Sequence, residues 1–217
     1  SEMKRWNLII VVLVCVSLAA ACVPATPAAP TPAPETPAAP RVEVIKVGAL
    51  LPLTGTDAVN GEHQQWGHEF AVEQINAAGG IKCLGGANLQ MVYGDSQGRP
   101  EAGNAETERL ITREGVIAVM GAFHSGVTLP ATEIAERYEV PFIVPNALAG
   151  AITERGLNYT FKTAVSLEQM ASDSANFAKE MGTVTGVALV PNITFGQEML
   201  AAWEEAIPAS GINLLDR

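Results

Sequence analysis

The stretch that decides the fold begins with Val42-Glu-Val-Ile-Lys-Val-Gly-Ala-Leu-Leu51, continues through the turn Pro52-Leu-Thr-Gly55, and reaches Phe70-Ala-Val-Glu-Gln-Ile-Asn-Ala-Ala-Gly-Gly-Ile81. The first segment predicts a buried strand, because it is mostly apolar and ends at a turn of Pro and Gly. The residues after the turn predict a helix over 62–77, with Trp66, Phe70 and Ile75 on one side. Gly79-Gly80 would end this helix, since glycine readily adopts the left-handed conformation of a helix end.

The alternation of strand and helix repeats along the chain. Pro100 is expected to open a helix, as proline does at a first helical position, and Ala105, Leu110 and Ile111 are expected to form its apolar stripe. The other predicted strands are residues 88–93, 116–121, 141–144, 160–164, 186–190 and 212–215, and the other predicted helices are residues 127–138, 167–181 and 197–206. This alternation predicts an α/β fold, in which a parallel sheet carries helices on both faces.

The composition excludes several classes of protein. The chain has 217 residues, of which 48% are hydrophobic and 17% charged, and its formal net charge is -10. This length and hydrophobic content allow a buried core and exclude a wholly disordered chain. The negative charge argues against a nucleic-acid partner, because binding to phosphates needs clustered cations.

Residues 1–21 are interpreted as a cloning remnant, Ser1-Glu2, followed by a signal peptide. Lys4-Arg5 precede a short apolar run that ends in small residues, which is typical of secretory signals. The alternative is a permanent membrane-anchor helix, although the run of about 14 residues is shorter than the ~20 that span a bilayer.

Residues 22–41 are interpreted as a lipid-anchored linker. Leu18-Ala-Ala-Ala21 before Cys22 resembles the lipobox of bacterial lipoproteins, although that pattern prefers leucine where Ala19 stands. Seven prolines then occur in the 17 residues 24–40, and such a tract forms an extended spacer rather than a core. Cys22 is therefore the expected site of lipid attachment; the alternative is a plain signal peptide with an incidental cysteine.

One motif suggests catalysis. Gly94-Asp-Ser-Gln-Gly98 matches the G-x-S-x-G motif of serine hydrolases, with Ser96 as the nucleophile. A hydrolase also needs a downstream acid and histidine, and the only downstream histidine, His124, follows after 28 residues with no intervening strand–helix unit to supply the acid. A serine hydrolase is therefore a disfavoured alternative.

No cofactor or metal is expected. The sequence lacks the glycine-rich motifs of nucleotide sites. His63 and His68 are five residues apart, on different faces of the predicted helix, rather than four apart as in a helical zinc site. Both are expected to be exposed, and Cys83 is expected to be an unreactive loop thiol, since no activating group accompanies it.

The turns after the predicted strands are candidate binding surfaces, because ligands of open α/β sheets lie beyond the carboxyl ends of strands. Ser125 follows the third strand at the start of a helix, where free N–H groups suit a carboxylate or another anion. The alternative is that Ser125 is only a helix cap. Asn146, after the fourth strand, could face the same crevice. Because no catalytic acid–base pair accompanies these residues, the turns predict binding without chemistry.

Several stretches resemble the periplasmic branched-chain amino acid binding proteins. They are residues 47–55, 70–81, 94–100, 121–131, 140–145 and 191–196. The resemblance implies the type I periplasmic-binding-protein fold, in which two α/β lobes close over a ligand. Lobe 1 would span residues 42–164, and residues 165–217 would begin a lobe 2 that is incomplete in this chain.

The resemblance also implies residues that bind the ligand. In relatives that bind leucine-type amino acids, a serine matching Ser125, followed here by Gly126, grips the ligand carboxylate. The next loop supplies Asn146, Ala147 and Leu148. Leu148 replaces a threonine that contacts both the carboxylate and the ammonium group, so recognition of plain α-amino acids stays open.

Two further ligand-binding residues come from other parts of the chain. Phe195, followed by Gly196, matches an aromatic residue of lobe 2 in the relatives, often a tyrosine. Asn60 matches a position that is aromatic in some of them.

The function implied is that of an extracytoplasmic, lipid-anchored solute-binding protein without enzyme activity. It would capture a small polar solute, such as an amino acid, an amide or a small carboxylate, and deliver it to the permease and ATPase of an ABC importer. The alternative is a ligand-sensing domain of the same fold that reports to a receptor.

Overall fold

The computed structural model describes residues 43–216. The expected signal peptide, the lipid-bearing Cys22 and the linker of residues 22–41 lie outside these residues, and all three stay predictions. Within residues 43–216, no helix is both long enough and apolar enough to cross a membrane.

Five parallel strands form the larger sheet. They are β1 (Val44–Leu51), β2 (Asn88–Asp95), β3 (Val119–Gly121), β4 (Phe142–Val144) and β5 (Thr160–Lys162). Their order is β2-β1-β3-β4-β5, so β1 lies between β2 on one side and β3 on the other. Each predicted strand is present, and β3 begins three residues later than predicted. Because the strand order changes direction at β1, the turns after β1 and β3 border the crevice in which such sheets bind ligands.

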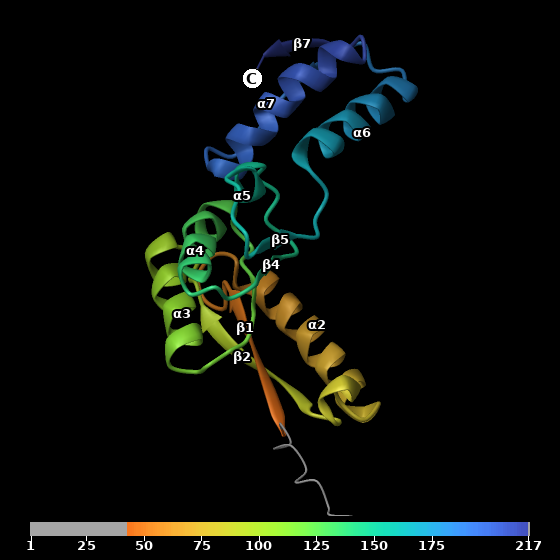
Figure 1. The fold of residues 1–217 in the computed structure, drawn as a ribbon. Coiled ribbons are helices and arrows are strands. Elements are labelled where there is room, and N and C mark those ends of the chain that lie inside the picture. The colour runs from red at the N-terminus through yellow and green to blue at the C-terminus, as the bar shows by residue number, and fades with distance from the viewer. Residues whose placement is uncertain (1–42, 217) are drawn as a thin grey trace, which may run out of the picture. The chain divides into compact units, whose positions relative to one another are not determined.

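Helices cover both faces of this sheet, which confirms the predicted fold class (Figure 1). The helices α3 (Pro100–Thr112) and α4 (Ser125–Arg137) lie on one face, and α2 (Ala58–Ala77) lies on the other. Two short elements were not predicted, the 3-10 helix η2 (Lys82–Leu84) and the single turn α5 (Ala151–Glu154). Both are too short for their apolar residues to show a helical period.

The prediction of a single apolar side on α2 was wrong. Trp66 and Phe70 are 56% and 65% exposed, and residues nine apart, such as Trp66 and Ile75, project about 180° from each other on a helix. The helix also begins four residues earlier than predicted. Its start lies against the first turn: a Cβ at buried Gly61 would come within 2.1 Å of the carbonyl oxygen of Pro52, so a larger residue would push the helix away.

Pro100 opens α3 as predicted, but the predicted stripe needs one correction. Ala105 is exposed, whereas Leu110 is fully buried and Ile111 is half-buried against the core. The buried residues of α3 are Gly103, Thr107 and Leu110, whose spacing of four and three marks the face toward the sheet.

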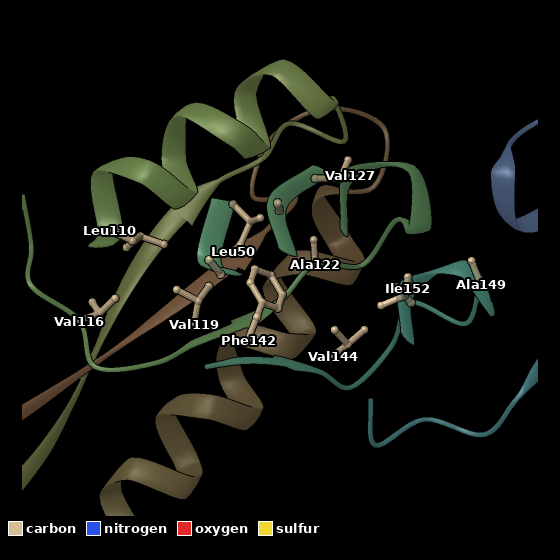
Figure 2. Close-up of a cluster of buried hydrophobic side chains, with 13 residues drawn as sticks. Leu50, Leu110, Val116, Val119, Ala122, Val127, Phe142, Val144, Ala149 and Ile152 are labelled. Atoms are coloured by element: carbon tan, nitrogen blue, oxygen red, sulfur yellow. The ribbon is translucent and has the colours of Figure 1, made fainter. Parts of the chain in front are cut away.

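The main hydrophobic core fills the space between the sheet and the helices α3 and α4. Figure 2 shows the ring of Phe142 from β4 near Val119 of β3 and Ala122. The cluster consists of Leu50, Leu110, Val116, Val119, Ala122, Val127, Ala131, Ala135, Phe142, Val144, Ala147, Ala149 and Ile152. Since the cluster includes Ala122, directly after β3, and Ala147, three residues after the end of β4, the packing of the core restrains the path of both turns.

The rest of the chain forms a second strand–helix group. It contains α6 (Leu167–Glu180), β6 (Thr185–Val187), α7 (Thr194–Ala209) and β7 (Asn213–Asp216), and β6 and β7 pair in parallel as predicted. Ser166 caps α6, since its hydroxyl accepts the N–H of Gln169 at 3.2 Å. Leu167, Ala171 and Met199 join α6 to α7, and Leu148 and Phe195 pack against this small core.

Candidate functional site

A cavity of about 440 Å³ lies at the carboxyl ends of β2, β3 and β4. Pockets for small molecules have volumes of this size. The residues that line it are Gly98, Pro100, Phe123, His124, Ser125, Gly126, Val127, Asn146, Leu148, Ile193, Thr194 and Phe195. Five of the residues predicted to bind ligand, namely Ser125, Gly126, Asn146, Leu148 and Phe195, thus lie around one cavity although the chain separates them widely.

Ser125 lies at the start of α4 and is almost completely buried, with 3% of its surface exposed. Its Oγ accepts the backbone N–H of Ala149 at 3.4 Å, which connects α4 to the loop after β4. Ser125 is the first residue of α4 and His124 occupies the cap position, so Ser125 is not the cap, and its role as a ligand residue stays a prediction. At the first helical position, the hydroxyl lies at the positive end of the helix dipole, where an anion is favoured.

The loop after β4 forms a second wall of the cavity. Asn146 and Leu148 line the cavity, whereas Ala147 does not line it and packs into the main core instead. The ammonium group of Lys162, at the end of β5, donates to the carbonyl oxygens of Leu148 at 3.2 Å and Ala149 at 3.4 Å. Lys162 therefore restrains the backbone of the loop through two of its carbonyl oxygens.

The start of α7 forms a third wall. Ile193, Thr194 and Phe195 line the cavity. The next residue is Gly196, where a Cβ would lie 1.9 Å from the carbonyl oxygen of Pro191. This contact explains why an aromatic residue is followed here by glycine, since any side chain at position 196 would displace the start of α7.

Asn60 does not line the cavity. It lies in the first turn of α2, is exposed, and its Nδ2 donates to Oδ1 of Asp57 at 3.3 Å. Asp57 in turn accepts a hydrogen bond at 3.0 Å from the ring nitrogen Nε2 of His124, which does line the cavity. The role of Asn60 as a ligand residue stays a prediction.

His124 and Phe123 also line the cavity, and neither was predicted from the sequence to do so. Both lie between β3 and Ser125, and their rings contact each other edge to face, with centroids 5.1 Å apart. From the sequence, His124 was considered only as the histidine that a serine hydrolase would need. The position of His124 directly before Ser125, the predicted anion-binding serine, could have indicated that His124 lies beside the same cavity.

The structure does not support a nucleophilic role for Ser96. Its side chain is fully buried in the turn after β2, and its Oγ accepts the backbone N–H of Gly98 at 3.4 Å. A nucleophile elbow instead exposes its serine at the end of a strand. Ser96 therefore stabilises the turn that leads into α3.

Within the part of the chain that the structure describes, no three metal-binding side chains gather. His63 is exposed as expected, but the expectation for His68 was wrong. His68 is half-buried and stacks on Tyr93 with ring centroids 6.4 Å apart, and burial lowers its pKa. Cys83 is an exposed free thiol in η2.

Known proteins share both the sequence pattern and the fold. The family profile described as periplasmic binding protein matches residues 44–217. The Leu/Ile/Val-binding protein homolog 8 of Brucella abortus is 37% identical over 132 residues, which are 61% of this chain and 32% of that protein. The chain thus spans about a third of the length of this curated relative.

Two solved structures extend the comparison. The branched-chain amino acid transporter substrate binding protein LivJ from Streptococcus pneumoniae, in complex with isoleucine, has a TM-score of 0.71 and 26% identity, covering 80% of this chain and 48% of that one. A solute binding protein of an ABC transporter from R. palustris, in complex with benzoate, has a TM-score of 0.72 and 28% identity, with coverages of 80% and 47%. The profile match over most of the chain, together with these likenesses, shows that the chain belongs to the periplasmic binding protein family, as the resemblance predicted.

Proposed function

We propose that the protein captures a small polar solute, an amino acid, an amide or a small carboxylate, in the cavity at the carboxyl ends of β2, β3 and β4. One observation carries this proposal. The cavity brings the buried hydroxyl of Ser125, at the start of α4, together with side chains from the turn after β4 and from the start of α7. A polar group of the solute would bind at Ser125, and its body would occupy the remaining space.

The walls of the cavity support a solute with an apolar body. Five of its twelve lining residues have branched or aromatic apolar side chains from the turns and helix starts around it, namely Phe123, Val127, Leu148, Ile193 and Phe195. Burial of apolar surface contributes about 25 cal/mol per Å², and the few polar groups then fix the orientation of the ligand. Isoleucine and benzoate, the ligands of the two solved relatives, both carry a carboxylate on an apolar body.

We further propose that the protein acts outside the cytoplasm, anchored by a lipid on Cys22, and delivers its solute to the permease and ATPase of an ABC importer. The family and the transporter named for both solved relatives support this proposal. The proline-rich composition of residues 24–40 and the acidic charge of the chain support this proposal, since both suit a domain held near a membrane surface by a lipid and not by a polybasic patch.

Thermal unfolding with added solutes tests the binding proposal. The panel contains isoleucine, benzoate, benzamide and glycerol, each with the wild-type protein and with Ser125→Ala. A solute at 100 times its dissociation constant adds about 2.7 kcal/mol of stability, which raises the unfolding temperature of a domain of this size by about 5–10 °C. We expect a shift with at least one carboxylate and a smaller shift in the variant. The absence of a shift with all four solutes would contradict the proposal.

A further inference from the structure

The backbone of the loop after β4 is hydrogen-bonded to neighbouring elements at three consecutive residues, Leu148, Ala149 and Gly150. The first two residues are bonded to Lys162 of β5 and to Ser125 of α4, which both belong to the larger sheet and its helices. The third residue is bonded to α7, which belongs to the second strand–helix group. The loop that forms one wall of the cavity is thus connected to both parts of the fold.

The contact with α7 is made by Glu198. Its Oε2 accepts the backbone N–H of Gly150 at 2.7 Å, a short distance that is typical of a charged acceptor. Gly150 is buried, and a buried N–H that loses its acceptor is costly, because water cannot readily replace it. This hydrogen bond therefore stabilises the position of α7 against the loop.

Glu198 lies on the side of α7 that carries the cavity wall. Thr194 and Phe195 line the cavity, and they precede Glu198 by four and three positions, which places all three on one face of the helix. On the other side of the contact, Leu148 lines the cavity and packs against the same small core as Phe195. The hydrogen bond to Gly150 therefore joins two walls of the cavity one helical turn away from it.

The bond acts on a solute only through these walls, because neither Glu198 nor Gly150 lines the cavity. A solute in the cavity contacts both the start of α7 and the loop after β4, and it holds them together. The hydrogen bond favours the same arrangement. Since the coupling between two such interactions is reciprocal, each should stabilise the other.

We propose that Glu198 is a positioning residue of the binding site, which holds the start of α7 against the loop after β4 and thereby slows the release of the solute. This inference rests on the proposed function and deepens it, since it assigns part of the affinity to a contact outside the cavity. Because Glu198 does not touch the solute, its loss should change the rate of dissociation rather than the rate of association.

The test measures both rate constants by stopped-flow fluorescence on the full chain, with benzoate, isoleucine, benzamide and glycerol as probes. In Glu198→Ala, the dissociation rate constant of a probe that binds should rise by about fivefold or more, because a hydrogen bond to a charged acceptor is lost. The association rate constant should stay within about twofold of the wild-type value. Glu198→Gln keeps an amide oxygen as acceptor and should show a smaller rise in dissociation, since a neutral acceptor forms a weaker bond.

A matched control separates this role from a general loss of stability. Glu205 is an exposed glutamate of the same helix and lies outside the cavity, so Glu205→Ala should leave both rate constants unchanged. A variant with a smaller folded fraction would give a smaller signal amplitude, but its folded molecules would release the probe at the wild-type rate. Thermal unfolding of each variant without probe shows whether it is folded.

Hydrogen exchange of the Gly150 amide, followed by nuclear magnetic resonance, tests the reciprocal effect. In the wild-type protein, a saturating probe should slow this exchange, because the solute favours the arrangement in which the hydrogen bond is formed. In Glu198→Ala without probe, the exchange should be faster than in the wild type. An exchange rate that the probe leaves unchanged would contradict the proposed coupling.

The outcomes distinguish this inference from the proposed function. If the wild-type protein binds a probe and Glu198→Ala releases it at the wild-type rate, the role of Glu198 is refuted and the proposed function stands. If Glu198→Ala is unfolded, Glu198→Gln carries the test, and a wild-type dissociation rate then refutes the role. If none of the four probes binds the wild-type protein, the proposed function fails, and the inference fails with it.

Discussion

The carboxylate of Asp95, at the end of β2, offers a sharp test of how the turns around the cavity are held. Its Oδ1 accepts three backbone N–H groups, those of Leu53 at 2.9 Å, Thr54 at 3.2 Å and Gln97 at 2.9 Å. Its Oδ2 accepts only the hydroxyl of Thr54 at 2.6 Å. Asp95 thus connects the turn after β2 to the turn after β1. Oδ1 accepts more of the connecting hydrogen bonds than Oδ2 does.

Because most of these hydrogen bonds go to one oxygen, two substitutions of Asp95 should lower the stability by different amounts. Asp95→Ala should lower the free energy of unfolding by about 3 kcal/mol. The half-buried N–H of Leu53 loses its acceptor, which costs about 1–2 kcal/mol, and each of the three exposed hydrogen bonds costs about 0.5 kcal/mol, because water replaces it. Asp95→Asn keeps an amide oxygen that can accept from the three N–H groups. These hydrogen bonds become weaker, because bonds to a charged acceptor are roughly twice as strong as bonds to a neutral one. We therefore expect this variant to lose only about 1 kcal/mol of unfolding free energy.

Urea unfolding at pH 7, followed by circular dichroism, measures both losses. Thermal unfolding should show a decrease of about 6–12 °C for the alanine variant and about 2–4 °C for the asparagine variant. Equal losses in the two variants would refute the assignment of three bonds to one oxygen. No loss in either would show that the turn is held by other contacts.

The pH dependence supplies an independent check on Asp95. Burial by itself raises its pKa, but the hydrogen bonds from Thr54, Gln97 and Leu53 outweigh this effect and lower the pKa below the ordinary 3.8. A lowered pKa means that the ionised carboxylate stabilises the folded state above pH 3.8 and that this contribution is lost as the pH falls through the folded value. The stability difference between wild type and Asp95→Asn should therefore be constant from pH 5 to 8 and should disappear in acid.

Three further predictions concern the candidate site and the proposed lipid anchor. Ser125→Ala should weaken binding of a carboxylate by about 1–3 kcal/mol, the cost of losing a buried polar partner, as measured by calorimetry; an unchanged affinity would exclude Ser125 from the site. Lys162→Met should weaken the same binding by about 1 kcal/mol, because the carbonyl groups of Leu148 and Ala149 lose their common donor. Proteolysis of the loop after β4 should also become faster in this variant. An unchanged rate of proteolysis would show that the core alone holds the loop. Cys22→Ser should abolish lipid labelling and release the protein from the membrane fraction, and retention of the label would place the anchor elsewhere.

The sequence determined the larger part of the fold. The apolar segments ending at Leu51 and Val144 form buried strands as predicted, Pro100 begins its helix as predicted, and the alternation of strands and helices correctly indicated a parallel sheet covered on both faces. These features depend on local periodicity and on the backbone preferences of Pro and Gly, which act within a few residues and therefore appear in the sequence itself.

The sequence was less reliable where two elements had to fit together. The spacing of Trp66 and Ile75 excluded a single apolar side on α2, but it did not show that Trp66 would be the exposed residue, because the side of a helix that faces the sheet is set by the packing of its partners. Gly61 shows the reason: its close approach to Pro52 fixes the start of the helix, and a contact between a helix and a preceding turn leaves no periodic signal.

The candidate site was predictable from the sequence only in part. The sequence predicted Ser125, Asn146 and Phe195 one by one as ligand residues, because each follows a strand end or matches a family motif. Only the tertiary structure brought them to one cavity and added His124, held by an aspartate 67 positions earlier in the chain. Periodicity fixes which residues lie at the ends of strands, but the order of the strands decides which ends are neighbours, and that order results from the packing of the whole sheet.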